Sequence, residues 1–221
     1  MALKAVAFDI DGTLYPNWRM QLFSFPFLLT HLPLVMKFSK VRKELRGIEN
    51  ISDFRKTQSE LMAARLGGSV EEASSTVETI IYRKWETIFK RVKPYSGLQS
   101  ALEELKSMGL SLGVMSDFPV GNKLNYFRVD GHWNAVMSSE ETGYLKPHAA
   151  PFLALARKLG CRPEEVLYVG NSYEYDVKGA SAAGMKTVYI QCQGKIVPEA
   201  DLTIRNFKDF VKNIEFLLRE E

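Results

Sequence analysis

Ten residues near the start of the chain, Ala5-Val6-Ala7-Phe8-Asp9-Ile10-Asp11-Gly12-Thr13-Leu14, bring two carboxylates to the end of an apolar run. The run is rich in small and β-branched residues, which predicts a fully buried strand over residues 4–10. In an extended chain Asp9 and Asp11 point to the same side, so they stand close together unless the chain turns between them. Such a pair is costly without a shared proton or a cation, and Mg²⁺ prefers carboxylate oxygens. The alternative is a strand that ends in an ordinary Asp-Gly turn.

Strand and helix patterns alternate from Pro94 onward. We predict strands over residues 110–116, 135–138, 165–169, 186–190 and 202–204, and helices over 97–108, 119–128, 151–159, 176–183 and 206–218. Alternation at this spacing implies parallel pairing with right-handed crossovers. The predicted fold class is therefore α/β, a doubly wound (Rossmann-like) parallel sheet.

Residues 15–93 break this alternation. They contain helical stretches at 51–65 and 70–90, which predicts an all-α segment inserted after the first strand. We expect residues 1–14 and 94–221 to form the α/β core and residues 15–93 to form a separate helical domain.

One part of this insertion, Leu22 to Phe38, is strongly apolar but is interrupted by Pro26 and Pro33. Its 17 residues are at the lower limit for a membrane span. A buried insertion helix or a partner-facing patch is favoured over membrane contact.

Composition narrows the class of protein. The 221 residues are 46% apolar and 25% charged, as in an ordinary soluble globular protein. Cys161 and Cys192 form no CxxC or Cys/His cluster, which fits a reducing compartment and gives no support for zinc or disulfides. The N-terminus runs almost at once into the first strand, so no signal peptide is expected there. We expect a cytoplasmic protein, a monomer or a homodimer.

The charge is uneven. The net charge is +3, but residues 15–93 hold 14 basic against 8 acidic residues. No basic run is interleaved with stacking aromatics, so nucleic-acid binding is not expected. A basic segment beside an acidic site suits a small anionic ligand, although most of these charges belong to solvated helix faces.

Four groups fall at the carboxyl ends of predicted strands, where open α/β sheets bind ligands. They are the Asp9/Asp11 pair, Ser116, Lys146 and the segment from Gly170 to Asp176. Singly, each has an ordinary explanation, such as a helix cap or a surface lysine. Jointly, they supply the nucleophile, proton donor, charge neutralisation and cation ligands that phosphoryl transfer requires.

These groups resemble the haloacid dehalogenase superfamily in order and spacing. Asp9-Ile10-Asp11-Gly12-Thr13-Leu14 is similar to its first motif, Ser116 to the second, Lys146-Pro147 to the third, and Val169-Gly170-Asn171-Ser172 with Asp176 to the fourth. The four motifs span residues 9–176, and the helical insertion stands where the family places its type 1 cap.

The resemblance implies a Mg²⁺-dependent phosphatase acting on a small phosphorylated metabolite. Asp9 would attack phosphorus and form an aspartyl-phosphate, and Asp11 would be the general acid and base. Ser116 would bind a phosphoryl oxygen, and Lys146 would offset negative charge. Mg²⁺ would be held by the Asp9 carboxylate, the Asp11 main-chain carbonyl and the fourth motif, through Asn171 and Asp176. The dehalogenases of the family lack a carboxylate at the position of Asp11, which makes dehalogenation the minor alternative.

Substrate contacts beyond the motifs are expected from Asp117, next to Ser116, and from Tyr15 and Arg19, which follow the first motif. Packing at a hinge is the alternative for Tyr15, and Arg19 could clamp a second anionic group.

Two positions depart from the family pattern: relatives usually have Asp where Asn171 stands and an acid where His148 stands. Loss of a negative charge at Asn171 predicts a greater need for Mg²⁺. A further alternative is that the protein is a catalytically weak member of the family, which binds a phosphorylated ligand or a protein partner. A phosphotransferase or mutase is a further alternative.

Overall fold

The computed structural model describes residues 2–191, 198–208 and 210–218, so Cys192 lies outside the described residues. The strands are β1 (Ala5–Asp9), β2 (Ser111–Ser116), β3 (Ala135–Ser138), β4 (Val166–Gly170), β5 (Lys186–Ile190) and β6 (Leu202–Ile204). The helices that alternate with them are α4 (Leu98–Ser107), α5 (Lys123–Tyr126), α6 (Ala149–Lys158), α7 (Lys178–Ala182) and α8 (Phe210–Leu218). Shorter turns are η3 (Asp130–His132), η4 (Ser139–Thr142), η5 (Pro163–Glu165) and η6 (Tyr173–Val177).

All six strands form one parallel sheet in the order β3-β2-β1-β4-β5-β6. The predicted doubly wound α/β class is confirmed. The chain starts at the centre with β1, builds outward through β2 and β3, and then returns to β4 on the other side of β1. This reversal leaves a crevice at the carboxyl ends of β1 and β4, where ligands of such sheets bind.

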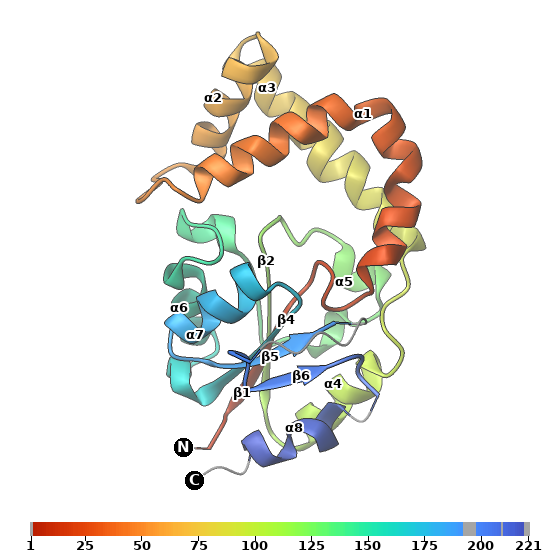
Figure 1. Ribbon diagram of the computed structural model, residues 1–221, viewed down its shortest axis with the longest axis vertical. Helices are drawn as coiled ribbons and strands as arrows, with labels where there is room; N and C mark the ends of the chain where they lie inside the picture. Colours follow the sequence, from red (N-terminus) through yellow and green to blue (C-terminus); the bar gives the residue numbers. More distant parts are fainter. Residues whose placement is uncertain (1, 192–197, 209, 219–221) are drawn as a thin grey trace.

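Helices cover both faces of the sheet (Figure 1). Val6 and Phe8 of β1 pack in a cluster with residues of α4 and α8, whereas Ala5 and Ala7 pack with residues of α6 and α7. Because successive side chains of a strand alternate between faces, one strand with no polar residue before Asp9 serves both layers. This burial holds the end of β1, and with it Asp9, in a fixed position.

The predicted strands agree with the observed ones to within one residue at each end. The predicted helix over 119–128 is wrong in extent, since only α5, residues 123–126, is helical. Residues 119–120 are irregular, Gly121 lies in a turn with a left-handed backbone (φ 53°) before α5, and Arg128 adopts a left-handed backbone (φ 58°) after it. The predicted helix over 206–218 also starts later than expected, because residues 206–208 are not helical.

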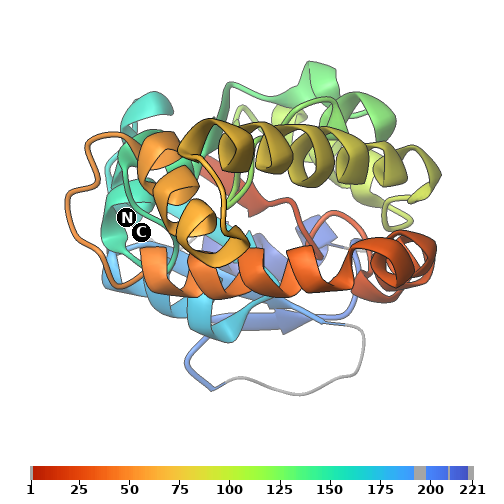
Figure 2. The same cartoon turned by 90° about the horizontal axis from the view of Figure 1, so that it is seen from above.

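Residues 15–93 contain helices and no strand: α1 (Asn17–Leu45), α2 (Phe54–Leu66), α3 (Val70–Thr76), the π-helical η1 (Val77–Lys84) and the 3₁₀-helical η2 (Thr87–Arg91). Asp53 caps α2 by accepting from Lys56 N–H, and Ser69 forms a reciprocal capping box with Glu72. Two long helical runs, α1 and α3 continuing into η1, extend across the sheet (Figure 2). That residues 15–93 act as a cap domain stays a prediction.

The apolar stretch within α1 is largely exposed. Phe27 and Phe38 are buried on the inward side, but Leu22, Phe25, Leu29, Leu32 and Met36 lie 49–70% exposed, at alternating spacings of three and four residues. The expectation of a buried insertion helix is therefore wrong for most of this stretch, because only one side of α1 meets the rest of the protein. By length and composition alone α1 could cross a membrane, which is weak evidence for a span. The expectation of a partner-facing patch is not tested.

Candidate active site

The site begins where β1 ends. Asp9 is the last residue of the strand and is 4% exposed, and the chain then turns at Gly12. Gly12 has a left-handed backbone (φ 95°), and a Cβ there would lie 2.3 Å from side-chain atoms of both Asn17 and Asn171. Only glycine fits this turn, because a side chain would be strained and would collide with its neighbours. The turn separates Asp9 from Asp11, and each carboxylate meets a different lysine.

Lys146 joins Asp9 to Asp176. Its Nζ lies 2.7 Å from Asp9 Oδ1, 2.7 Å from Asp176 Oδ1 and 3.1 Å from the Tyr168 hydroxyl. All three charged groups are buried. Gly170 permits this approach, since a Cβ there would lie 2.3 Å from the Cβ of Asp176. One ammonium thus compensates two buried carboxylates from the first and fourth motifs.

Burial raises the pKa of Asp9 to about 7, although Lys146 opposes the shift, and the nearby Asp176 and Asp11 raise it further. Burial disfavours the charged form of Lys146, but Asp176 and Asp9 outweigh this and hold the pKa of its ammonium well above the ordinary value. Because one ammonium faces two carboxylates, ionised Asp9 and Asp176 keep one negative charge that a second cation could balance.

Asp11 is held by Lys123, whose Nζ lies 3.0 Å from Oδ1 and 2.9 Å from Oδ2. Ser116 Oγ donates to Asp11 Oδ2 at 2.5 Å, and the Tyr15 hydroxyl donates to Oδ1 at 3.2 Å. Burial raises the pKa of Asp11, but Lys123 and the hydrogen bond from Ser116 outweigh it, so the net pKa lies below the ordinary value. The structure thus brings Asp9, Asp11, Ser116 and Lys146 together at one edge of the sheet.

Lys123 is a site residue that the sequence analysis missed. It lies on α5 and is 4% exposed, with Nζ 4.9 Å from the centre of the Phe89 ring and 5.7 Å from that of Phe118. The available signal was its place on the first helical segment after Ser116, but a lysine there usually faces solvent. The orientation of the Lys123 side chain depends on the turn at residues 121–122, which takes the place of the first part of the predicted helix.

Asp117 faces the helical insertion. Its Oδ2 lies 2.6 Å from Arg46 Nη2, and its Oδ1 accepts from Ser139 Oγ and Lys146 N–H. Burial raises its pKa, but Lys146 and Arg42 outweigh this and hold the pKa below the usual range. An anionic side chain with these partners anchors the insertion to the motif loops, and this arrangement gives no support to the predicted substrate contact.

Arg46, at the end of α1, touches three motif loops. Besides Asp117, its Nε donates to the Lys146 carbonyl at 2.9 Å, and its guanidinium lies 4.3 Å from the centre of the Tyr175 ring. Replacing Arg46 by Met should lower the free energy of unfolding by about 1–3 kcal/mol, because the contacts with Asp117 and the Lys146 carbonyl are lost. The loss is no larger because Asp117 keeps its hydrogen bonds from Ser139 and Lys146.

Urea denaturation measures this loss. Arg65→Met is the matched control: it breaks the exposed pair with Glu44 inside the insertion and should cost less than about 1 kcal/mol. Equal losses in the two variants would show that Arg46 does not anchor the insertion.

Arg19 and Tyr15 have different positions. Arg19 Nη1 donates to the main-chain carbonyls of Lys93 at 2.7 Å and Pro94 at 2.9 Å, where the insertion returns to the core. It does not line the cavity beside Asp11, so this arrangement gives no support to the predicted anion clamp. Tyr15 both packs against Phe89, with ring centroids 5.6 Å apart, and lines the cavity.

Oxygen atoms that could hold a cation lie near Asp9 Oδ2, the carboxylate oxygen for which no bond to Lys146 is found. Thr13 Oγ1 lies 2.8 Å from Asp9 Oδ2 and 3.2 Å from Asn171 Oδ1, and it has one proton to donate to the two acceptors. Asp176 Oδ2 accepts from Ser172 N–H. Within the described residues no group of three or more His, Cys, Asp or Glu converges on one point. Mg²⁺ needs only one or two carboxylates when water and phosphate complete its shell, so this donor set fits it.

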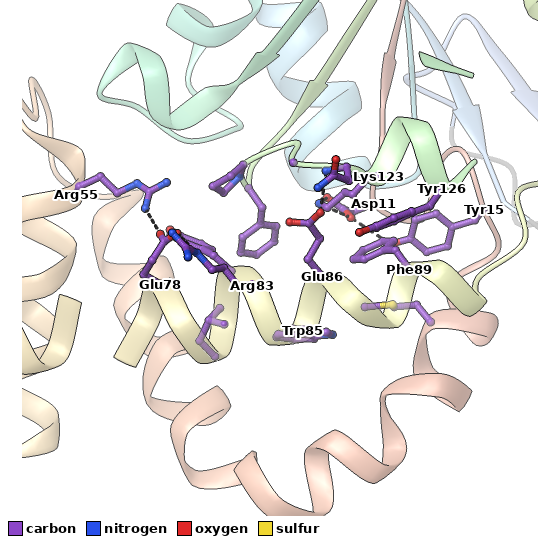
Figure 3. Close-up of a pocket in the computed structure, with 17 residues that line it drawn as sticks. Asp11, Tyr15, Arg55, Glu78, Arg83, Trp85, Glu86, Phe89, Lys123 and Tyr126 are labelled. Atoms are coloured by element: carbon purple, nitrogen blue, oxygen red, sulfur yellow. Dashed lines mark hydrogen bonds and ion pairs between the residues drawn. The ribbon is translucent and has the colours of Figure 1, made fainter. Parts of the chain in front are cut away.

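A cavity of about 530 Å³ opens beside Asp11, between the insertion and the core (Figure 3). Its lining residues come from the first motif turn, from residues 78–89 of the insertion and from the loop and helix at 118–126, with Met20 and Arg55 in addition. In Figure 3, Arg55, Glu78 and Arg83 lie at one end and the aromatic Tyr15, Phe89 and Tyr126 at the other, with Asp11 and Lys123 between them.

The family model of haloacid dehalogenase-like hydrolases matches residues 6–190. The chain belongs to this family. It is 31% identical over 216 residues to a glyceraldehyde 3-phosphate phosphatase of Methanopyrus kandleri, covering 94% of this chain and 90% of that protein.

The hydrolase is also 25% identical over 228 residues to a phosphoglycolate phosphatase of Aquifex aeolicus, covering 95% of this chain and 96% of that one. A solved structure of a phosphatase of the family from Thermococcus onnurineus matches the fold with a TM-score of 0.60 at 24% identity, covering 95% and 97% of the two chains. The predicted resemblance and the enzyme class, a phosphatase, are confirmed.

Proposed function

We propose that this hydrolase releases phosphate from a small phosphorylated metabolite through an aspartyl-phosphate on Asp9. The observation that carries the proposal is the pair of separated carboxylates. Asp9 is held by Lys146 at the buried end of β1, and Asp11 is held by Lys123 and Ser116 beside the cavity. One carboxylate is positioned to attack and the other to exchange a proton with the leaving group.

In the first step a carboxylate oxygen of Asp9 forms a bond to phosphorus while the bond from phosphorus to the leaving oxygen breaks. Asp11 donates a proton to that oxygen. An arriving phosphate dianion raises the pKa of the neighbouring carboxyl groups, which favours the protonated form of Asp11 at this stage. In the second step Asp11 takes a proton from water, the water oxygen bonds to phosphorus, and the acyl-phosphate bond breaks to restore Asp9.

Ser116 and Lys146 serve the transferring group. The Ser116 hydroxyl now donates to Asp11 and can turn to a phosphoryl oxygen, and Lys146 neutralises charge on Asp9. The Asp9 carboxylate, the Asp11 main-chain carbonyl, the Asn171 amide oxygen and Asp176 would hold Mg²⁺, which would supply further charge neutralisation at the phosphoryl oxygens. We propose that residues 15–93 form a cap that excludes water from this site.

The test is release of p-nitrophenol and inorganic phosphate from p-nitrophenyl phosphate, with Mg²⁺ and with EDTA. The proposal expects equal amounts of both products, and only with Mg²⁺. Nitrophenol without matching inorganic phosphate would indicate transfer to a second substrate. No release at high Mg²⁺ would support the catalytically weak alternative.

Asn171 bears on the Mg²⁺ requirement. Asn171→Asp should lower the Mg²⁺ concentration at half-maximal activity by about threefold or more, because it adds a negative charge near Asp9. A Mg²⁺ titration of phosphatase activity measures the change. Asn125→Asp, an exposed site, is the control and should leave the midpoint unchanged. A midpoint that rises in Asn171→Asp would contradict the assignment of Asn171 to the metal site.

We also propose a cytoplasmic protein, a monomer or a homodimer, without nucleic-acid or membrane contact. The structural support concerns membrane contact and comes from α1, the one apolar helix long enough to span a membrane among the described residues. Its end carries the buried Arg42, which pairs with Glu140 of the core at 2.5 Å. Such a pair needs α1 folded against the core.

A further inference from the structure

We propose that the cavity beside Asp11 selects phosphomonoesters whose leaving group is a neutral, hydroxylated ring alcohol, such as a sugar or a nucleoside. Esters whose leaving group carries a second anion should be poor substrates. This inference rests on the proposed function, because it takes Asp11 as the acid that protonates the leaving oxygen.

The leaving group belongs in this cavity. Asp11, Tyr15 and Lys123 line it, whereas Asp9, Ser116 and Lys146 do not. An acid must come within about 3 Å of the oxygen that it protonates. A substrate whose phosphorus is beside Asp9 therefore extends past Asp11 into the space between the insertion and the core.

The space is larger than a two- or three-carbon group requires. Its volume of about 530 Å³ lies within the range of pockets that enclose ring-containing ligands, roughly 300–1,000 Å³. A small leaving group would touch only the wall next to Asp11 and leave the rest to water. A ring with its substituents fills more of this volume.

Aromatic side chains line both walls. The insertion contributes Tyr82, Trp85 and Phe89, and the core contributes Phe118 and Tyr126. Aromatic faces pack well against flat partners, whether the apolar face of a sugar or a base, and such pairs add specificity beyond their buried area. A small, fully charged leaving group gains little from these walls.

Glu86 sets the charge preference. Its Oε1 accepts from Asn122 N–H at 2.7 Å, and its half-buried carboxylate lines the cavity between Asp11 and the Glu78 cluster in Figure 3. No ion pair reaches Glu86 within the described part of the chain, and the Lys123 ammonium is already engaged with Asp11. A second anion on the leaving group would meet Asp11 and Glu86, whereas a hydroxyl can donate to Glu86.

The cations at the far end are already directed at carboxylates. Arg55 Nη1 lies 2.8 Å and Arg83 Nε 2.9 Å from the two oxygens of Glu78, and Arg55 Nε lies 3.7 Å from Glu140. Each arginine is thus held by a carboxylate at the end of the cavity away from Asp11, and neither is directed at the leaving oxygen beside Asp11.

The experiment compares kcat/KM for six phosphate compounds in Mg²⁺: p-nitrophenyl phosphate, glyceraldehyde 3-phosphate, phosphoglycolate, pyrophosphate, ribose 5-phosphate and adenosine 5′-monophosphate. We expect ribose 5-phosphate or adenosine 5′-monophosphate to exceed phosphoglycolate and pyrophosphate by about tenfold or more. We expect glyceraldehyde 3-phosphate to fall between the two groups, since its leaving group is neutral but small.

Glu86→Gln supplies the second readout. It retains an acceptor for Asn122 N–H but removes the charge, so kcat/KM for ribose 5-phosphate should fall by about tenfold while that for phosphoglycolate rises. Hydrolysis of p-nitrophenyl phosphate, which has no hydroxyl for Glu86, should change less than either. Glu71→Gln, on the exposed surface of α3, is the control and should leave all the ratios unchanged.

Two kinds of failure are distinguishable. If p-nitrophenyl phosphate is hydrolysed but phosphoglycolate, pyrophosphate or glyceraldehyde 3-phosphate is the best substrate, the inference fails and the proposed function stands. The same holds if Glu86→Gln leaves the ratio of ribose 5-phosphate to phosphoglycolate unchanged. If none of the six compounds releases phosphate, both the proposed function and the inference are overturned.

Discussion

Replacing Asp9 by Asn should lower kcat for p-nitrophenyl phosphate by at least about 1,000-fold, as expected for loss of a covalent nucleophile. The amide has nearly the same shape as the carboxylate but cannot form the acyl-phosphate bond. Lys146 keeps Asp176 and Tyr168 as partners, so the fold should persist. Steady-state release of inorganic phosphate measures the loss. Asp130→Asn, at an exposed position, is the matched control. Activity within tenfold of the parent protein in Asp9→Asn would exclude Asp9 as the nucleophile.

The same variant should change how stability depends on pH. The pKa of Asp9 is raised to about 7 in the folded protein from 3.8, its ordinary value. The favourable contribution of the Asp9 carboxyl group to the free energy of unfolding is therefore present below pH 4. It is lost as the pH rises toward 7, because the folded state retains a proton that the unfolded state releases. Asp9→Asn removes this loss. In EDTA, its free energy of unfolding relative to the parent protein should rise between pH 4 and pH 7, as urea denaturation can measure.

Replacing Lys146 by Met should lower kcat by about 100-fold or more and the free energy of unfolding by about 3–5 kcal/mol. The activity loss follows from removing a cation beside the nucleophile. The stability loss follows because Asp9 and Asp176, both buried, lose the ammonium that compensates them. Phosphate release and urea denaturation measure the two losses separately.

A second substitution separates these two roles of Lys146. In Lys146→Met with Asp176→Asn, one buried carboxylate is neutralised, so stability should recover in part while activity stays low. Lys158→Met is the control. It breaks the half-exposed pair with Glu141 and should cost less than about 1 kcal/mol. A stability loss in Lys146→Met no greater than in this control would show that Lys146 is not needed to compensate the buried carboxylates.

The fold was largely predictable from local patterns. Runs such as residues 5–9 and 166–170 are apolar throughout, and this pattern requires burial on both faces of a sheet. The ends of the helices were harder to predict, because they depend on backbone turns. Residues 119–128 have an apolar spacing that suits a helix, but the left-handed backbones of Gly121 and Arg128 confine the helix to α5 between them.

The motif residues were predictable because a parallel sheet brings the carboxyl ends of its strands to one edge. Asp9, Ser116 and Gly170 end their strands as expected, and Lys146 follows β3 on a loop. Their partners were not predictable in the same way. Lys123, Arg42 and Arg46 look like ordinary charged residues in or next to helices, and their contacts depend on how the insertion lies on the core.

The sequence by itself determined the parallel sheet, the family and the edge at which the chemistry takes place, since strand periodicity and motif order are local properties of the chain. Only the tertiary structure decided which lysine holds which carboxylate, that Asp117 pairs with Arg46 and Arg19 with the Lys93 carbonyl, and that Glu86 lines the cavity beside Asp11. Each of these contacts joins residues far apart in the sequence, and their pairing follows from the packing of the helical insertion on the sheet.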